Sequence, residues 1–381
     1  MYSASKRVEF LDSIRGLAAL FVLFSHTCGA FVWPPSYFKI CGLPFISILF
    51  DGKEAVCMFF VLSGYVLSKP YVSTPENRSP RKIFLPTFYL RRLTRIWLPW
   101  FFVFVASILA RQYLFTQPST QPPVSGWLHQ FWQAAPGIGD CLRQCVFALH
   151  DGTRQLLNQD WSLGVELKGS LLIPLFLLLT HHKRIAAISA LAVVLLICFR
   201  NGHYYVSFII GVLLAQHGAI AAGWLAVLGT KARVIFSILG LSLYQAFHLF
   251  TQMFPETPWV LVKCGWTITS LGCALVLLSV FSSQRSQKFL NFKPVVFLGK
   301  ISYSVYLVQF IIILCLLPPL VRLANAHGII QPFTLFLLTF TASVGATLLC
   351  ATFTCYVAEV PAINFGHWLT KKIQTVFKVR T

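Results

Sequence analysis

Two ionisable side chains fall inside the first apolar stretch of the chain, where charge is costly in lipid. Arg15 and His26 are 11 positions apart, so a helix would carry them on one face, about 20° out of phase and about 16 Å apart along its axis. An imidazole can act as a general base and a guanidinium can bind an anion. The alternatives are an Arg15 that snorkels to the membrane surface and a His26 that only hydrogen-bonds to a neighbouring helix.

A carboxylate, Glu166, lies near the start of a later apolar stretch. If that helix enters from the outer side, Glu166 lies about 7–9 Å below its outer end, at the depth expected for His26. A carboxylate and an imidazole at one level could serve as a general base and its orienting partner. The alternative is a structural role for Glu166 as the partner of Lys168 or of an indole.

Three arginines, Arg91, Arg92 and Arg95, precede another apolar stretch within five positions. Guanidinium groups at this density suit an anion rich in phosphate. The alternative is that they anchor the helix by binding lipid headgroups. Five further polar side chains and one aromatic one are expected to line a site, without an assigned role: Asp12, Ser25, Ser63, Tyr65, Asp160 and Ser162.

The composition indicates the class of protein to which these candidate site residues belong. Of 381 residues, 56% are hydrophobic and only 11% are charged, whereas soluble domains carry about a quarter charged residues. This excludes a soluble globular enzyme and a disordered chain and predicts a polytopic membrane protein. The net charge of +20 comes from short basic clusters between apolar runs, so we expect membrane lipid rather than nucleic acid as the partner of these clusters.

The hydropathy pattern predicts an all-α, polytopic helical bundle of about ten transmembrane helices, formed by a single domain over residues 1–381. A further apolar segment at 219–231 could add a re-entrant turn, and the longest polar stretch, 117–160, is expected to form an external loop. The predicted spans lie near 11–33, 54–72, 94–116, 161–181, 184–200, 203–219, 232–254, 259–283, 296–320 and 331–358.

The distribution of basic residues predicts the orientation. With both termini in the cytoplasm, the inner segments hold more than twice as many Lys and Arg residues as the outer ones. Cys41, Cys141 and Cys145 then lie outside, and the sequence leaves a disulfide among them open. The chain has no Walker phosphate loop, no dinucleotide-binding glycine motif and no zinc-ligand spacing, so we expect no metal site.

Six motifs, taken in order along nearly the whole chain, resemble the acyltransferase type 3 family of bacterial integral membrane acyltransferases. They are Arg15-x10-His26, Phe59-Phe60-Val61-Leu62-Ser63-Gly64, Arg91-Arg92-x-x-Arg95-Ile96-x-x-Pro99, Trp161-Ser162-Leu163-x-x-Glu166, Leu298-Gly299-x-Ile301-Ser302-Tyr303-Ser304-x-Tyr306-Leu307 and Glu359-x-Pro361.

The resemblance implies transfer of an acyl group, most often acetyl, from cytoplasmic acyl-CoA to a hydroxyl of an envelope saccharide or glycolipid at the inner (plasma) membrane. It implies that His26 is the base or handles the acyl group, that Arg15 and the arginines at 91, 92 and 95 serve the CoA side, and that Glu166 is catalytic or orienting. The chain departs from the family pattern at three places: Lys168-Gly169-Ser170 replaces an acid and an aromatic pair, Cys57 replaces an acid, and Gln309 replaces a histidine.

Two readings from other classes compete with the enzyme. A proton-coupled transporter or flippase of a small envelope precursor would use His26 and Glu166 as a proton relay and predicts symmetry between the two halves; the sequence has no detectable internal repeat. A scaffold or sensor built on an inactive acyltransferase fold would tolerate the loss of His26.

Overall fold

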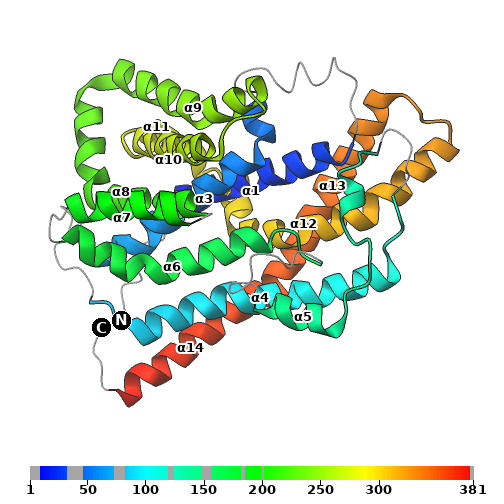
Figure 1. Ribbon diagram of the computed structural model, residues 1–381, viewed down its shortest axis with the longest axis horizontal. Coiled ribbons are helices and arrows are strands. Elements are labelled where there is room, and N and C mark those ends of the chain that lie inside the picture. The colour runs from blue at the N-terminus through cyan, green and yellow to red at the C-terminus, as the bar shows by residue number, and fades with distance from the viewer. Residues whose placement is uncertain are drawn as a thin grey trace.

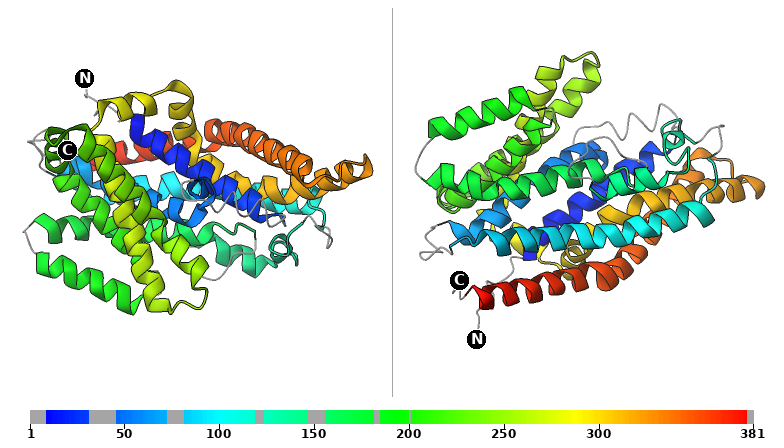
Figure 2. Two further views of the ribbon diagram at one scale, coloured as in Figure 1. Left: turned by 90° about the horizontal axis from the view of Figure 1, so that it is seen from above. Right: turned by 60° about the horizontal axis from the view of Figure 1, so that its bottom comes forward.

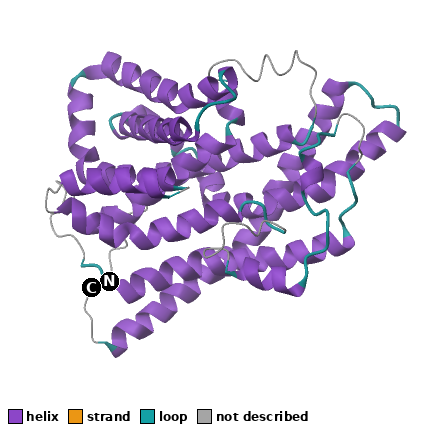
Figure 3. Ribbon diagram, viewed as in Figure 1, coloured by secondary structure: helices purple, strands orange, loops and turns teal. Residues whose placement is uncertain are grey.

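The computed structural model describes residues 9–31, 46–72, 82–118, 124–146, 156–181, 185–199 and 201–377. Within these ranges the chain is helical, as Figure 3 shows, and its β-type pairing is limited to an isolated bridge between Phe31 and Val124. The predicted all-α fold is therefore confirmed. Lys6, Arg7, Lys39, Cys41, Arg78, Arg81, Arg154, Lys183, Arg184, Arg200, Lys378 and Arg380, which entered the orientation and disulfide arguments, lie outside the described residues.

Figure 1 labels the α-helices and colours them in their order along the chain, and short 3₁₀ turns and a π-helical turn lie between them. The 3₁₀ turns are η1 (Ser47–Phe50), η2 (Lys69–Tyr71) and η3 (Leu128–Gln130), and the π-helical turn is η4 (Cys355–Glu359). The α-helices are α1 (Glu9–Gly29), α3 (Gly52–Ser68), α4 (Leu85–Tyr113), α5 (Ile138–Cys145), α6 (Asp160–His181), α7 (Ile185–Cys198), α8 (Gly202–Val227), α9 (Gly229–Met253), α10 (Trp259–Phe281), α11 (Gln284–Leu290), α12 (Lys293–Ala326), α13 (Pro332–Thr354) and α14 (Val360–Val376).

Eight helical segments within the described residues are long and apolar enough to cross a membrane. Each of the ten predicted spans overlaps a helix, but α3 and α7 have only 17 and 14 residues. A full span requires roughly 20 residues, so these two helices are shorter than the others. The polytopic helical bundle is confirmed, with eight full-length candidate spans and two shorter apolar helices.

Two helices extend well beyond the predicted spans. The helix α4 begins at Leu85, nine residues before the predicted boundary, with a proline in its first turn, where proline is favoured because its missing N–H needs no partner. The three arginines therefore lie within the helix rather than in a loop before it. The helix α8 continues to Val227, and α9 follows after Gly229, whose φ is +89°. The segment 219–231 thus extends a helix and forms no re-entrant turn.

The helices α13, η4 and α14 follow one another without a break from Pro332 to Val376. The π-helical turn between them brings the Glu359 carboxylate to Ser304 of α12, whose hydroxyl donates to it at 2.8 Å. From that turn on, α14 runs beside α4, as Figures 1 and 2 show.

Glycines allow two pairs of helices to approach each other closely. A Cβ built on Gly16 of α1 would lie 2.5 Å from the backbone nitrogen of Gly299 in α12, and one built on Gly299 would lie 2.3 Å from the Asp12 carbonyl carbon. A Cβ on Gly64 of α3 would lie 2.3 Å from the Phe208 carbonyl oxygen in α8. Only small residues let backbones come this near, so the glycines at 16, 64 and 299 permit these crossings.

The two ends of the described chain lie at the same end of the bundle. Gly299 lies against Asp12, so the first turns of α1 and α12 are neighbours, and the Tyr303 hydroxyl donates to the Ile96 carbonyl, so α12 and α4 run in parallel. Phe84, just before α4, and Phe377, just after α14, are 6.2 Å apart by ring centroids. We call this the basal end and the opposite one, which carries His26, the apical end.

The polar stretch 117–160 packs onto the apical end rather than extending from it. Leu128, Trp132 and Leu157 within it are 3% exposed or less, and the Ser125 backbone nitrogen and hydroxyl donate to Ala30 and Gly29 at 3.0 and 2.6 Å. The described part of this stretch also includes η3, α5 and the first residue of α6. Cys141 and Cys145 are free thiols in α5.

The close contact between α1 and α12 predicts that one added methyl group at Gly299 lowers the stability of the protein. In Gly299→Ala the new Cβ would collide with the Asp12 backbone, which has no flexible end to move, so we expect a loss of about 1–3 kcal/mol of stability and a lower Tm in detergent. Gly345→Ala in α13 is the matched control, because nothing lies within 4 Å of a Cβ built there. Equal melting temperatures for the two variants would contradict the tight contact.

Candidate active site

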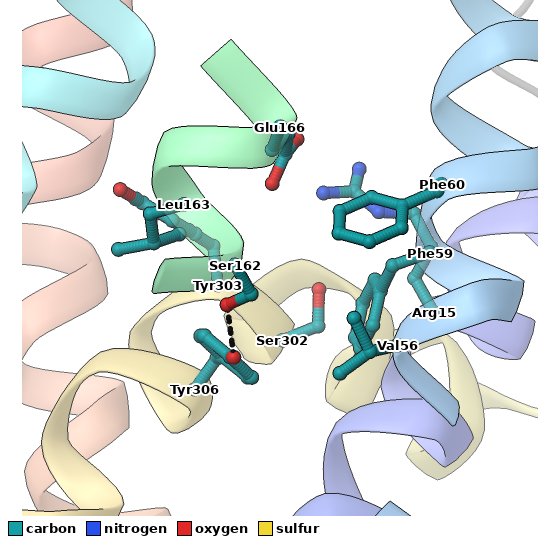
Figure 4. A pocket seen from close by; sticks show the side chains of 10 residues that line it. All are labelled: Arg15, Val56, Phe59, Phe60, Ser162, Leu163, Glu166, Ser302, Tyr303 and Tyr306. Carbon is teal, nitrogen blue, oxygen red and sulfur yellow. Dashed lines mark hydrogen bonds between the residues drawn. The ribbon is translucent and has the colours of Figure 1, made fainter. Parts of the chain in front are cut away.

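A pocket lies between four helices that meet in the middle of the bundle, and Figure 4 shows the side chains that line it. Each of α1, α3, α6 and α12 contributes, so the wall combines residues far apart in the sequence. The lining residues are Arg15, Val56, Phe59, Phe60, Ser162, Leu163, Glu166, Ser302, Tyr303 and Tyr306. One wall is apolar and aromatic, and the other carries a guanidinium, a carboxylate and hydroxyl groups.

Glu166 is held on the pocket wall by an ion pair with Arg92. Arg92 Nη2 lies 3.4 Å from Glu166 Oε1, and the two side chains are 11% and 19% exposed. The same nitrogen donates to the Ser170 hydroxyl at 3.2 Å, and the Ser63 hydroxyl donates to Glu166 at 3.4 Å. Arg92 Nε is buried and has no hydrogen-bond partner within the described part of the chain. The arginine therefore keeps one donor free beside the pocket.

Arg15 lines the same pocket from α1. Its Nη1 lies 3.9 Å from Asp12 Oδ1, three residues earlier on the same helix, which makes a long ion pair. Figure 4 shows its guanidinium and the Glu166 carboxylate turned into the pocket from facing helices. Two arginines, Arg15 and Arg92, and two carboxylates, Asp12 and Glu166, thus surround this part of the bundle.

His26 lies nearer the apical end, on the same face of α1. Its Nδ1 is 3.3 Å from Gln309 Oε1, and its ring stacks on Trp127 with centroids 5.9 Å apart and an angle of 20° between the planes. Gln309 is fully buried and its Nε2 donates to the Tyr306 carbonyl at 3.2 Å. With the amide nitrogen engaged there, the amide oxygen is left to accept from His26 Nδ1–H. This arrangement favours the tautomer whose Nε2 carries the lone pair.

One turn of α12 connects the pocket to the histidine. Tyr306 lines the pocket, its hydroxyl is hydrogen-bonded to the Ser162 hydroxyl, and its carbonyl holds Gln309. Phe310 follows on the next position and lies 4.6 Å from the His26 ring by centroids. The pocket and His26 therefore form two levels of one site along α12.

The structure does not bring His26 and Glu166 together, contrary to the expectation that they lie at one depth. The reason is the start of α6: Asp160 is 3% exposed and accepts from Trp100 Nε1 at 2.7 Å and from Gln144 Nε2 at 2.7 Å. This helix begins inside the fold, covered by residues 124–146 and 156–157, and not at the apical surface. Glu166 lies almost two turns deeper and meets Arg92 instead.

The three arginines of α4 point in different directions. Arg92 turns into the bundle, whereas Arg91 is exposed and its Nε donates to Thr370 of α14 at 3.1 Å. Arg95 is half-buried one turn above Arg91. Around the helix, positions 91 and 92 are about 100° apart, and position 95 lies between them, about 40° from 91 and 60° from 92.

Sequence reasoning left several site residues without a role. Ser63 and Ser162 were expected to line a site and do contact it, but Tyr303, Tyr306 and Ser302 were only parts of a motif. Gln309 was noted as a departure from the family pattern and proves to be the partner of His26. Trp127 carries no local signal, because nothing in its neighbourhood indicates that this loop folds back over α1.

A family model described as an acyltransferase domain matches residues 8–355. The chain belongs to the acyltransferase type 3 family. This membership and the apolar helices make it a multi-pass membrane acyltransferase. No curated protein and no solved structure matches the chain.

The pair of Arg92 and Glu166 predicts strong coupling between α4 and α6. Arg92→Met leaves Glu166 as an uncompensated, half-buried charge, so we expect a loss of about 3 kcal/mol, and Glu166→Leu leaves the arginine in the same state. The double variant should recover at least about 1 kcal/mol relative to the sum of the two. Melting temperatures of the four proteins in detergent measure the cycle.

Arg91→Met is the matched control for that cycle, because Arg91 is exposed and its Nε donates to the neutral hydroxyl of Thr370. We expect its Tm to stay within about 2 °C of wild type. Additive effects of Arg92→Met and Glu166→Leu would show that the 3.4 Å contact contributes no coupling energy.

Proposed function

We propose that the protein transfers an acyl group, acetyl in the simplest case, from cytoplasmic acyl-CoA to a hydroxyl of an envelope saccharide or glycolipid. The observation that most supports this is the two-level site along α12: a pocket lined by Arg15 and Glu166 at one level and an oriented histidine at the next. A donor with an anionic head and a slim thioester arm fits such a site. The family match favours this function over a proton-coupled transporter or flippase.

The basal end would receive the donor. Arg91 and Arg95 lie near that end of α4, and Lys371 and Lys372 lie in the last turns of α14 beside it. Under the positive-inside rule this end faces the cytoplasm of the inner membrane, so both termini are cytoplasmic. Phosphate groups of CoA are the anions that guanidinium groups bind best, and the free Nε of Arg92 offers a donor to the arm that follows.

The pocket would accept the pantetheine arm. Phe59, Phe60 and Val56 provide an apolar wall, and the hydroxyls of Ser302 and Tyr306 face the polar amides of the arm. Arg15 lies about 16 Å below His26 by helical rise. The extended arm would therefore carry the thioester from the arginine level up to the histidine.

His26 would act as the general base. Gln309 holds Nδ1, so Nε2 can remove the proton from an acceptor hydroxyl that enters from the apical end. The acceptor oxygen attacks the thioester carbonyl carbon, the C–S bond breaks, and CoA leaves as a thiolate that takes the proton from His26. The stacked ring of Trp127 and the tilted ring of Phe310 keep the imidazole in one orientation.

Replacement of the base tests this function. We expect His26→Ala to lower label transfer from radiolabelled acetyl-CoA by at least about 100-fold, both into envelope fractions and as slow hydrolysis by the purified protein. Glu166→Gln should retain part of the activity, because it keeps the shape of the pocket wall. The control is His327→Ala, an exposed histidine at the far end of α12.

Unchanged turnover in His26→Ala, with the protein folded, would refute the role of the base. Absence of both turnover and acetyl-CoA binding in the wild type would favour the transporter or the scaffold.

The orientation of His26 by Gln309 predicts a split between kinetic constants. Gln309→Met has a similar length but offers no acceptor, so the imidazole loses its fixed tautomer and kcat should fall about 10- to 100-fold. Because Gln309 does not line the donor pocket, KM for acetyl-CoA should change less than twofold. Gln309→Glu restores an acceptor oxygen and should recover activity relative to Gln309→Met.

If Gln309→Met and Gln309→Glu lose activity equally, or if KM rises with kcat unchanged, Gln309 has only a packing role.

A further inference from the structure

Three metal-ligating side chains converge away from the pocket, at the junction of η1 and α3 with α9. The carboxylate oxygens of Asp51 and Glu54 and an imidazole nitrogen of His248 all lie within 4.8 Å of one another. His248 Nε2 is 3.2 Å from Asp51 Oδ1, and His248 Nδ1 is 3.9 Å from Glu54 Oε1. No sequence motif indicates this group, because His248 is almost 200 residues from the two acids.

Both carboxylates are buried, and His248 is the basic side chain that faces them in the described part of the chain. Their side chains are 3% exposed, against 28% for His248. Within the described part of the chain no lysine or arginine forms an ion pair with either acid, and Lys53 between them is exposed. Two carboxylates facing one imidazole need a further positive charge, either a proton or a bound cation, since buried charge without compensation is strongly unfavourable.

A second layer of hydrogen bonds orients the acids. Gln245, one turn before His248 on α9, donates from Nε2 to Asp51 Oδ2 at 3.1 Å and is also hydrogen-bonded to the Ser47 hydroxyl. This leaves Asp51 Oδ1 turned to the histidine. Glu54 Oε1 lies beyond hydrogen-bond distance from the imidazole. Such support of ligands by outer partners is typical of metal sites.

We propose that Asp51, Glu54 and His248 bind one divalent cation of the Zn²⁺ or Mn²⁺ type, with water completing its coordination. Two carboxylates and a neutral imidazole balance a charge of +2. Two oxygen ligands and one imidazole nitrogen suit zinc and manganese better than magnesium, which prefers oxygen alone. The cation would replace the proton that His248 otherwise shares with Asp51.

The cation would stabilise the attachment of α9, a helix at the edge of the bundle, to α3. α9 packs mainly on α10, as Figure 1 shows. Only 22% of the residues in its most apolar 18-residue stretch are buried. Through Gln245 and His248 it reaches the start of α3, where a Cβ built on Gly52 would lie 3.0 Å from the Ser25 hydroxyl, next to His26. The cation would therefore stabilise the packing of α3 on α1, the helix that carries His26. It would take no part in the transfer itself.

Metal content of the purified protein tests the proposal. The protein is isolated without chelators and without a metal-affinity tag, and zinc and manganese are measured by inductively coupled plasma mass spectrometry. We expect about one equivalent in the wild type and less than a tenth of that in Glu54→Gln and His248→Ala. Glu256→Gln and His217→Ala, both exposed, are the matched controls and should keep the metal.

A thermal measurement on the wild type covers the case in which these variants fail to fold. EDTA should lower the Tm by about 4 °C or more, and ZnCl₂ or MnCl₂ should restore it, because a ligand that binds only the folded state stabilises it. A metal-free wild type whose Tm responds to neither treatment overturns the site and indicates an imidazolium held between two acids. That outcome is independent of the activity of His26→Ala, so it leaves the proposed transferase function untouched.

Discussion

The crossing of α1 and α12 is the contact on which the candidate site depends. Gly16 and Gly299 bring the two backbones together, and because the helices run in parallel from that point, the levels of one match the levels of the other. Arg15 therefore faces the pocket beside Ser302, and His26 meets Gln309 about three turns further on. A wider crossing would separate both pairs at once. The geometry of the candidate site therefore depends directly on the packing of α1 against α12.

Much of the fold follows from the hydropathy and the residue spacing of the sequence alone. Hydropathy places all ten apolar helices because burial in lipid requires runs of apolar residues whatever the tertiary packing. The spacing of Arg15 and His26 gives their shared face, because the helical period alone decides it. The start of α4 was misplaced by nine residues, since a charged segment after Pro86 can continue a helix that apolarity does not mark.

The pairings inside the site could not be read from the sequence, because they depend on where each helix begins in depth. Glu166 was expected beside His26, but the buried start of α6 at Asp160 moves it to Arg92. Gln309 and Trp127 reach His26 from α12 and from a loop, and no spacing along the chain relates them. The same holds for Asp51 and His248, which only the placement of α9 brings together.

The π-helical turn at Cys355–Glu359 joins α13 and α14 into one continuous helix. Side chains after the turn face a different direction from the one that the period of α13 would give them. An extra residue in one turn rotates everything after it by about 100°. This offset lets Glu359 face Ser304 while Thr370, three turns later, faces Arg91. In genetic terms, loss of one codon between Cys355 and Ala358 would leave every span long enough and every motif intact. It would nevertheless turn α14 away from α4, so the length of this segment carries information that residue identity does not.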